Sequence, residues 1–87
     1  MVEKKVVIQG ESGIHARPAT MLVKTASKYS CNVFIEKDGT DANLKSILNV
    51  LALGLTGGTE IKIKAEGEGE NEAVEEIVAL IERDFAE

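Results

Sequence analysis

Short segments in which apolar and polar residues alternate constrain the fold of this chain more than any other feature. The alternation is strictest in residues 60–66, where Ile61, Ile63 and Ala65 are separated by charged side chains. Residues 2–9 and 31–37 have the same period of two, which predicts β-strands with one apolar face each. Such strands favour a mostly antiparallel sheet that is covered by helices on one face only.

Helical periodicity separates these strands. Residues 16–28 carry small and branched apolar side chains along one stripe, and residues 70–84 do the same. Pro18 fits the first of these helices, because an amide in the first turn has no partner within the helix. A shorter helix is expected over residues 47–53, with Ser46 as its N-cap and Gly54 directly after it.

Turn signals complete the predicted order of elements. The pair Asp38-Gly39 is typical of a type I′ hairpin, so residues 40–43 should pair with the preceding strand. Residues 10–13 and 57–58 also have turn composition. The order β-α-β-β-α-β-α predicts an α+β fold, an open-faced two-layer sandwich, and we expect one domain over residues 1–87.

Composition excludes several classes of function. The 87 residues include 10 basic and 15 acidic side chains, and the net charge of −5 argues against nucleic acid as a direct partner. One cysteine excludes an internal disulfide and a cysteine-based zinc site. No apolar run approaches the ~18–20 residues of a membrane span. The N-terminus also lacks a signal-peptide pattern. We therefore expect a cytoplasmic protein without membrane insertion.

The charge is unevenly distributed along the chain. Residues 1–65 carry a net charge of +3, whereas residues 66–87 carry −8. An anion or an acidic partner is therefore expected to meet the N-terminal part of the protein.

His15, the only histidine, lies where a glycine-containing loop meets the first predicted helix. The backbone amides of Ala16 and Arg17 should be unpaired at this helix N-terminus, which favours binding of an anion such as phosphate. Arg17 adds a guanidinium whose geometry suits phosphate oxygens. Since imidazole is a nucleophile near neutral pH, His15 is a candidate for phosphorylation.

Other interpretations of His15 remain open at this point. A histidine at the start of a helix is often a cap or a solvated side chain. A metal site is less favoured, because the chain has no second histidine and no cysteine cluster. A Ser/His/Asp triad is not excluded by composition, although no nucleophile-elbow pattern is present.

The short helix over residues 47–53 has an apolar arc that is too wide for one contact with a sheet. Val50 and Leu53 fall on one side of it, whereas Ile47, Leu48 and Leu51 fall on another. Either a neighbouring helix buries the second group, or these side chains form an exposed patch that binds a partner protein.

Two motifs resemble those of a known family. The segment Gly13-Ile14-His15-Ala16-Arg17-Pro18-Ala19 is similar to the signature of HPr, the histidine phosphocarrier of the phosphoenolpyruvate-dependent sugar phosphotransferase system. The segment Asn43-Leu44-Lys45-Ser46-Ile47-Leu48 resembles the regulatory serine segment of the same family. The length, the order of elements and the spacing of the motifs agree along the whole chain.

The resemblance implies a fold and a reaction. The expected sheet has the strand order 1-4-2-3 with three helices on one face. His15 would accept a phosphoryl group from phospho-enzyme I and pass it to sugar-specific enzyme IIA components, with Arg17 contacting the phosphate. The protein would be a phosphocarrier rather than an enzyme, without a cofactor, and is expected to be a monomer.

The resemblance also implies regulation and a docking surface. An HPr kinase/phosphorylase would phosphorylate Ser46, and the phosphoserine form would bind a catabolite-control transcription factor. Partners are expected to dock on residues of both helices, namely Ala16, Thr20, Lys24, Lys45, Ile47, Leu48 and Leu51. A related regulator of the same fold carries a different residue at the active position, so His15 argues against that role.

Two alternatives stay open. One is a regulatory HPr that acts only through Ser46 in a cell without sugar permeases. The other is a ferredoxin-like interaction domain without catalysis, which has a similar length and similar elements.

Overall fold

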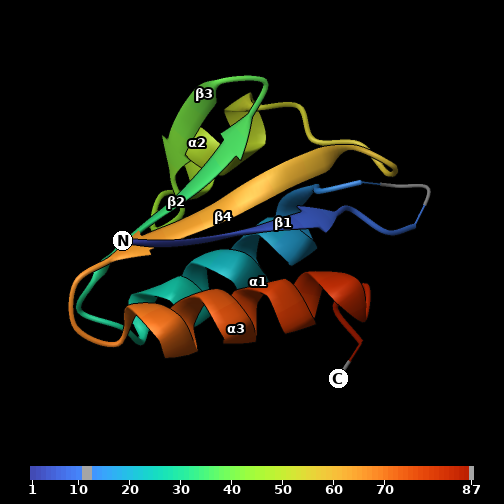
Figure 1. Cartoon of the computed structure of the whole chain (residues 1–87). Coiled ribbons are helices and arrows are strands. Elements are labelled where there is room, and N and C mark those ends of the chain that lie inside the picture. The colour runs from blue at the N-terminus through green and yellow to red at the C-terminus, as the bar shows by residue number, and fades with distance from the viewer. Residues whose placement is uncertain (11–12, 87) are drawn as a thin grey trace.

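The chain folds as a four-stranded antiparallel sheet with three helices on one side of it (Figure 1). The structure, a computed structural model, describes residues 1–10 and 13–86, so Glu11 and Ser12 of the predicted turn lie outside the described residues. The strands are β1 (Val2–Val7), β2 (Asn32–Lys37), β3 (Thr40–Asn43) and β4 (Glu60–Glu66). The helices are α1 (Ala16–Ser27), α2 (Ile47–Ala52) and α3 (Glu70–Glu82). The sheet order β1-β4-β2-β3 confirms the expected open-faced sandwich.

Two element ends differ from the prediction by two residues. β1 ends at Val7 rather than Gln9, because its partner strand β4 begins at Glu60, which pairs with Val7, and Ile8 hydrogen-bonds to the loop before β4. α3 ends at Glu82 rather than Asp84, because Asp84 and Phe85 have φ values of +52° and +61° and leave the helix. The remaining ends agree with the prediction within one residue.

The core lies between the sheet and the helices, and the predicted apolar faces form it. Ile61, Ile63 and Ala65 of β4 are fully buried, as are Leu22 of α1 and Ile77 of α3. Because strand side chains alternate between two faces, the neighbouring lysines of β4 lie on the opposite, open face of the sheet.

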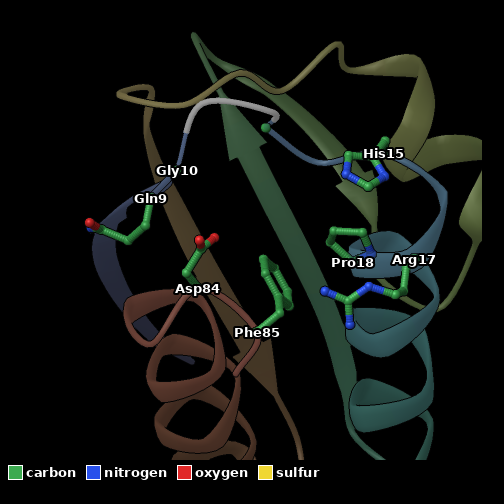
Figure 2. A pocket seen from close by; sticks show the side chains of 8 residues that line it. Gln9, Gly10, His15, Arg17, Pro18, Asp84 and Phe85 are labelled. Carbon is green, nitrogen blue, oxygen red and sulfur yellow. The ribbon is translucent and has the colours of Figure 1, made fainter. Parts of the chain in front are cut away.

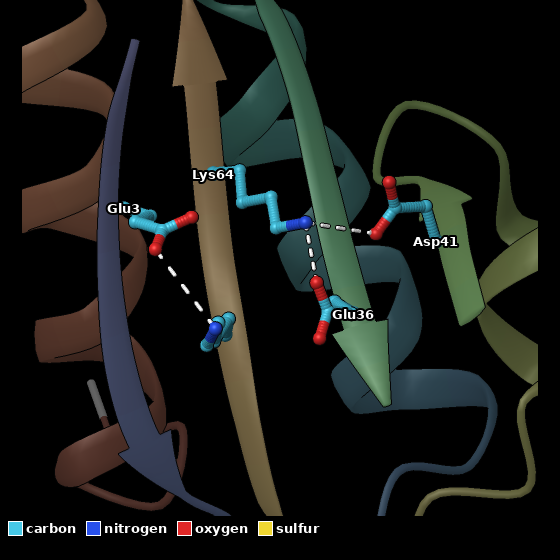
Figure 3. Close-up of polar contacts among 5 residues, drawn as sticks. Glu3, Glu36, Asp41 and Lys64 are labelled. Carbon is cyan, nitrogen blue, oxygen red and sulfur yellow. Dashed lines mark hydrogen bonds and ion pairs between the residues drawn. The ribbon is translucent and has the colours of Figure 1, made fainter. Parts of the chain in front are cut away.

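Ion pairs connect the strands across this open face (Figure 3). Lys64 of β4 pairs with Glu36 of β2, and its Nζ also lies 3.2 Å from Oδ1 of Asp41 on β3. The hydrogen bond from Lys64 lowers the pKa of the Glu36 carboxyl. The same hydrogen bond to Glu36 raises the pKa of Lys64. A shift of register by one residue would turn these charges toward the core, so the pairs support the observed register.

Gly13 allows the loop before α1 to contact the loop after α2. It has a φ of +69°, and a Cβ at this position would lie only 2.5 Å from the carbonyl oxygen of Leu55. The next amide, that of Ile14, donates a hydrogen bond to the same oxygen at 3.0 Å. The start of α1 is therefore fixed by a backbone contact that leaves no room for a side chain.

We predict that Gly13→Ala destabilises the fold more than Gly54→Ala does. Gly54 also has a positive φ, of +63°, but no atom lies within 4 Å of its Cβ position. Both variants incur the left-handed conformational cost of roughly 1 kcal/mol. Only Gly13→Ala adds the backbone clash, which should lower the free energy of unfolding by about 1–3 kcal/mol more. Urea unfolding of both variants measures the difference, and equal losses would contradict the close contact.

Candidate functional site

His15 occupies the N-cap position of α1, as the sequence predicts for a residue at a loop-to-helix junction. Its backbone is extended, its carbonyl accepts the first helical hydrogen bond from the Ala19 amide at 2.9 Å, and its side chain is exposed. The imidazole makes no capping hydrogen bond, so His15 holds the N-cap position through its backbone while its side chain is solvated. Among the described residues, no group accepts a hydrogen bond from the amides of Ala16 or Arg17. This helix end therefore presents two free N–H donors beside the imidazole.

A small pocket of about 140 Å³ lies beside His15 (Figure 2). It is lined by Gln9, Gly10, Gly13, His15, Arg17, Pro18, Asp84 and Phe85. These residues come from the end of β1, the start of α1 and the end of α3. The pocket brings together His15 and Arg17, the two residues that the sequence analysis selected for phosphate chemistry.

Four lining residues were not selected from the sequence: Gln9, Gly10, Asp84 and Phe85. Nothing in their local pattern indicates a site, because they reach the pocket only when β1 and α3 pack side by side. The side chain of Phe85 is buried.

The Arg17 side chain is exposed and lies along α1. Its Nη1 is 3.5 Å from Sδ of Met21, one helical turn further on. Within the described part of the chain, no carboxylate forms an ion pair with Arg17. Its guanidinium is thus available to an anion at the end of the helix.

The α1 residues predicted to bind partners lie on one surface of that helix. Ala16, Thr20 and Lys24 line a shallow groove together with Arg17 and Met21. The Thr20 hydroxyl donates to the Ala16 carbonyl at 2.8 Å and so faces back toward its own helix. We call this set of five residues the α1 groove.

Ser46 is the N-cap of α2, as predicted, because its Oγ accepts a hydrogen bond from the Asn49 amide at 3.3 Å. The exposed fractions of Ile47, Leu48 and Leu51 are 38%, 79% and 37%, whereas Val50 on the other side of the helix is fully buried. These three exposed residues, here called the α2 patch, confirm the predicted apolar surface. Burial of the patch by a neighbouring helix, the alternative interpretation, is wrong.

Two lysines hold α2 in place from outside the helix. Lys37 of β2 donates to the carbonyls of Leu53 and Gly54 at 3.1 and 3.3 Å, at the C-terminal end of α2. Lys45, which is expected to contact partners, donates a hydrogen bond to the Tyr29 carbonyl at 2.7 Å and is partly exposed. In the folded chain Lys45 therefore joins the start of α2 to the end of α1.

Within residues 1–10 and 13–86, no group of three or more His, Cys, Asp or Glu side chains is positioned to bind a metal ion. None of the helices in this part of the chain is long and apolar enough to span a bilayer.

Comparison with known proteins identifies the family. The family described as "PTS HPr component phosphorylation site" matches residues 2–83. The HPr-like protein Crh of Bacillus subtilis is 39% identical over 84 residues, which are 97% of this chain and 99% of Crh.

Solved structures agree with this match. An HPr from Thermoanaerobacter tengcongensis is 44% identical, with a TM-score of 0.95 over 100% of this chain and 98% of that one. The histidine-containing phosphocarrier protein of a Mycoplasma is 38% identical, with a TM-score of 0.89 over 99% of both chains. The sequence match over almost the whole chain and the shared fold show that this chain belongs to the HPr family of phosphocarriers.

Proposed function

We propose that this chain carries phosphoryl groups on His15, accepting them from phospho-enzyme I and passing them to sugar-specific enzyme IIA components. The observation that carries the proposal is that His15 and Arg17 line one pocket at the start of α1, where the amides of Ala16 and Arg17 have no hydrogen-bond acceptor among residues 1–10 and 13–86. When His15 accepts the group, one of its imidazole nitrogens forms a bond to phosphorus as the bond between phosphorus and enzyme I breaks. When the group is passed on, that nitrogen–phosphorus bond breaks as a nucleophile of the enzyme IIA component bonds to phosphorus. No cofactor is needed for this step.

The residues around His15 suit a transient phosphate. The amides of Ala16 and Arg17 and the helix dipole favour negative charge at this position. The guanidinium of Arg17 can form charge-assisted hydrogen bonds to the phosphate oxygens. Because His15 is exposed, both the donor and the acceptor protein can reach it.

The α1 groove and the α2 patch are the surface on which we propose that these partners dock. They belong to helices that contact each other, and together they combine apolar side chains with the positive charge of Lys24. We further propose that an HPr kinase/phosphorylase modifies Ser46, and that the phosphoserine form binds a catabolite-control transcription factor.

A regulatory protein without sugar transport is the second candidate, and the similarity to Crh favours it. A solved structure describes Crh as the Bacillus subtilis catabolite repression HPr. His15 favours the carrier over this candidate, because a purely regulatory chain does not need a phosphate-accepting imidazole. A sugar-uptake assay in cells with and without this chain separates the two candidates.

The remaining proposals concern the whole chain. We propose a single HPr-like domain over residues 1–87 that works in the cytoplasm. We also propose that it acts as a monomer, although Crh has been crystallised as a dimer with swapped segments. Sedimentation at micromolar concentration tests the oligomeric state.

We predict that His15→Ala abolishes phosphoryl transfer and leaves stability unchanged, because the side chain is exposed and makes no capping hydrogen bond. Arg17→Ala should only slow transfer. The helix amides remain in that variant, and one lost charge-assisted contact costs about 1.5–3 kcal/mol, or roughly 10- to 150-fold in rate. The rate of labelling by phosphoenolpyruvate in the presence of enzyme I measures phosphoryl transfer in both variants. Acid-labile phosphate on His15→Ala would contradict the assignment, and an unchanged rate for Arg17→Ala would remove Arg17 from the site.

We predict that negative charge at Ser46 slows phosphorylation of His15 without unfolding the domain. Ser46→Asp and Ser46→Asn both keep an N-cap oxygen for the Asn49 amide, so they differ mainly in charge. The aspartate places that charge beside Ile47 and Leu48, where a partner that docks must desolvate the surface. Only Ser46→Asp should bind enzyme I more weakly, with an unchanged or higher melting temperature. Ser46→Ala should lose about 1 kcal/mol of stability and transfer normally. A Ser46→Asp variant that is phosphorylated at the wild-type rate would refute the switch.

We predict opposite effects for two residues of α2. Leu48→Ala should change the free energy of unfolding by only about 0.5 kcal/mol, because Leu48 is mostly exposed. It should nevertheless weaken binding of enzyme I, since apolar anchors dominate small interfaces. Val50→Ala removes a fully buried side chain and should cost about 2 kcal/mol or more. Its affinity should remain normal under conditions where it is folded. Calorimetric titration and urea melts on both variants provide the comparison, and normal binding by Leu48→Ala would exclude the α2 patch.

A further inference from the structure

The wall of the pocket opposite α1 carries a carboxylate that the proposed transfer does not use. Figure 2 shows Asp84 on the α3 side of the pocket and Arg17 on the α1 side. The Asp84 carboxylate packs over Gly10, because a Cβ at Gly10 would lie only 2.9 Å from Oδ2 and 3.1 Å from Oδ1. The end of β1 thus leaves space that the Asp84 side chain fills.

The backbone at Asp84 has the left-handed conformation that glycine adopts with the least strain. The Asp84 amide donates to the Ile81 carbonyl and the Phe85 amide to the Leu80 carbonyl, each at 3.0 Å. This hydrogen-bond pattern closes a helix through a left-handed residue that is usually glycine. Here that residue is Asp84, with a φ of +52°. An aspartate in this conformation is tolerated at some cost, and such exceptions cluster at functional sites.

Phe85 keeps the carboxylate in this place. Its side chain is buried, so the chain end cannot swing away without exposing an aromatic ring. The neighbouring charge of Arg83 is engaged elsewhere, because Nε of Arg83 donates to the Ala86 carbonyl at 2.7 Å. Among its described lining residues, the pocket therefore contains one permanently charged cationic side chain, Arg17, and one carboxylate side chain, Asp84.

We propose that Asp84 destabilises the phosphorylated state of His15 and so sets how readily the phosphoryl group is passed on. The inference rests on the proposed function. A phosphoryl group on His15 adds nearly two negative charges beside the pocket, which Arg17 attracts and Asp84 repels. The repulsion from Asp84 favours the unmodified state.

Competition for phosphoryl groups tests the inference directly. Equal amounts of ¹⁵N-labelled wild type and unlabelled Asp84→Asn are mixed with catalytic enzyme I and a limiting amount of phosphoenolpyruvate. At equilibrium, mass spectrometry gives the phosphorylated fraction of each protein. We expect the phosphoryl group to favour Asp84→Asn by about 3- to 10-fold at low salt, and less as salt screens the charges. A ratio of one, or a ratio that favours the wild type, would overturn the inference.

Three control variants separate charge from structure. Asp84→Gly removes the charge and suits the left-handed backbone, so it should melt at a higher temperature and still show the same shift as Asp84→Asn. Asp84→Glu keeps the charge and should remain within about twofold of the wild type. Glu82→Gln removes an exposed acid of α3 that does not line the pocket, and it should leave the ratio at one.

A chemical donor separates failure of the inference from failure of the proposed function. Phosphoramidate transfers its phosphoryl group to an imidazole nitrogen, as its own bond between phosphorus and nitrogen breaks and ammonia leaves. Hydrolysis by water then restores the imidazole and gives inorganic phosphate. Phosphorylated Asp84→Asn prepared in this way should persist at least about threefold longer than the phosphorylated wild type. Equal lifetimes overturn the inference alone, whereas a wild type that enzyme I cannot phosphorylate overturns the proposed function.

Discussion

The position of His15 depends on backbone hydrogen bonds to a single loop, the one that joins α2 to β4. This loop accepts from the Ile14 amide through the carbonyl of Leu55 and exchanges two hydrogen bonds with Ile8 through Thr59 and Gly58. It therefore holds the chain on both sides of the turn that connects β1 to α1. The start of α1, with its free amides, is placed by these contacts and not by the local sequence alone.

Alternation and capping residues were sufficient to predict most of the fold. The period of Ile61, Ile63 and Ala65 identified the central strand β4, and the Asp38-Gly39 turn has the two positive φ values, +50° and +82°, that a type I′ hairpin requires. The strand order could not be predicted in this way, because alternation shows which face of a strand is buried and not which strands are neighbours. That order came from the resemblance to HPr, and the family match now excludes the ferredoxin-like alternative.

The candidate site was only half predictable from the sequence, for a physical reason. His15 and Arg17 are two residues apart at a helix start, so a local motif reveals both. Asp84 and Gln9 lie at distant points of the chain and meet them only through packing of α3 beside β1. The end of α3 was also misplaced, because a left-handed turn made by Asp84 and Phe85 lacks the glycine that normally signals it.

Both ends of α2 are held by side chains, and this explains how a helix of six residues can display an apolar surface. Ser46 caps its first turn and Lys37 bonds to the carbonyls of Leu53 and Gly54 directly after it, so its shape is fixed before any partner arrives. A helix this short would not form in isolation. Because α2 is already ordered, binding of a partner does not have to order its backbone. Association can therefore be fast even though few side chains are buried. A small contact area favours fast release as well, which would suit the proposed transfer of a phosphoryl group from one partner to the next.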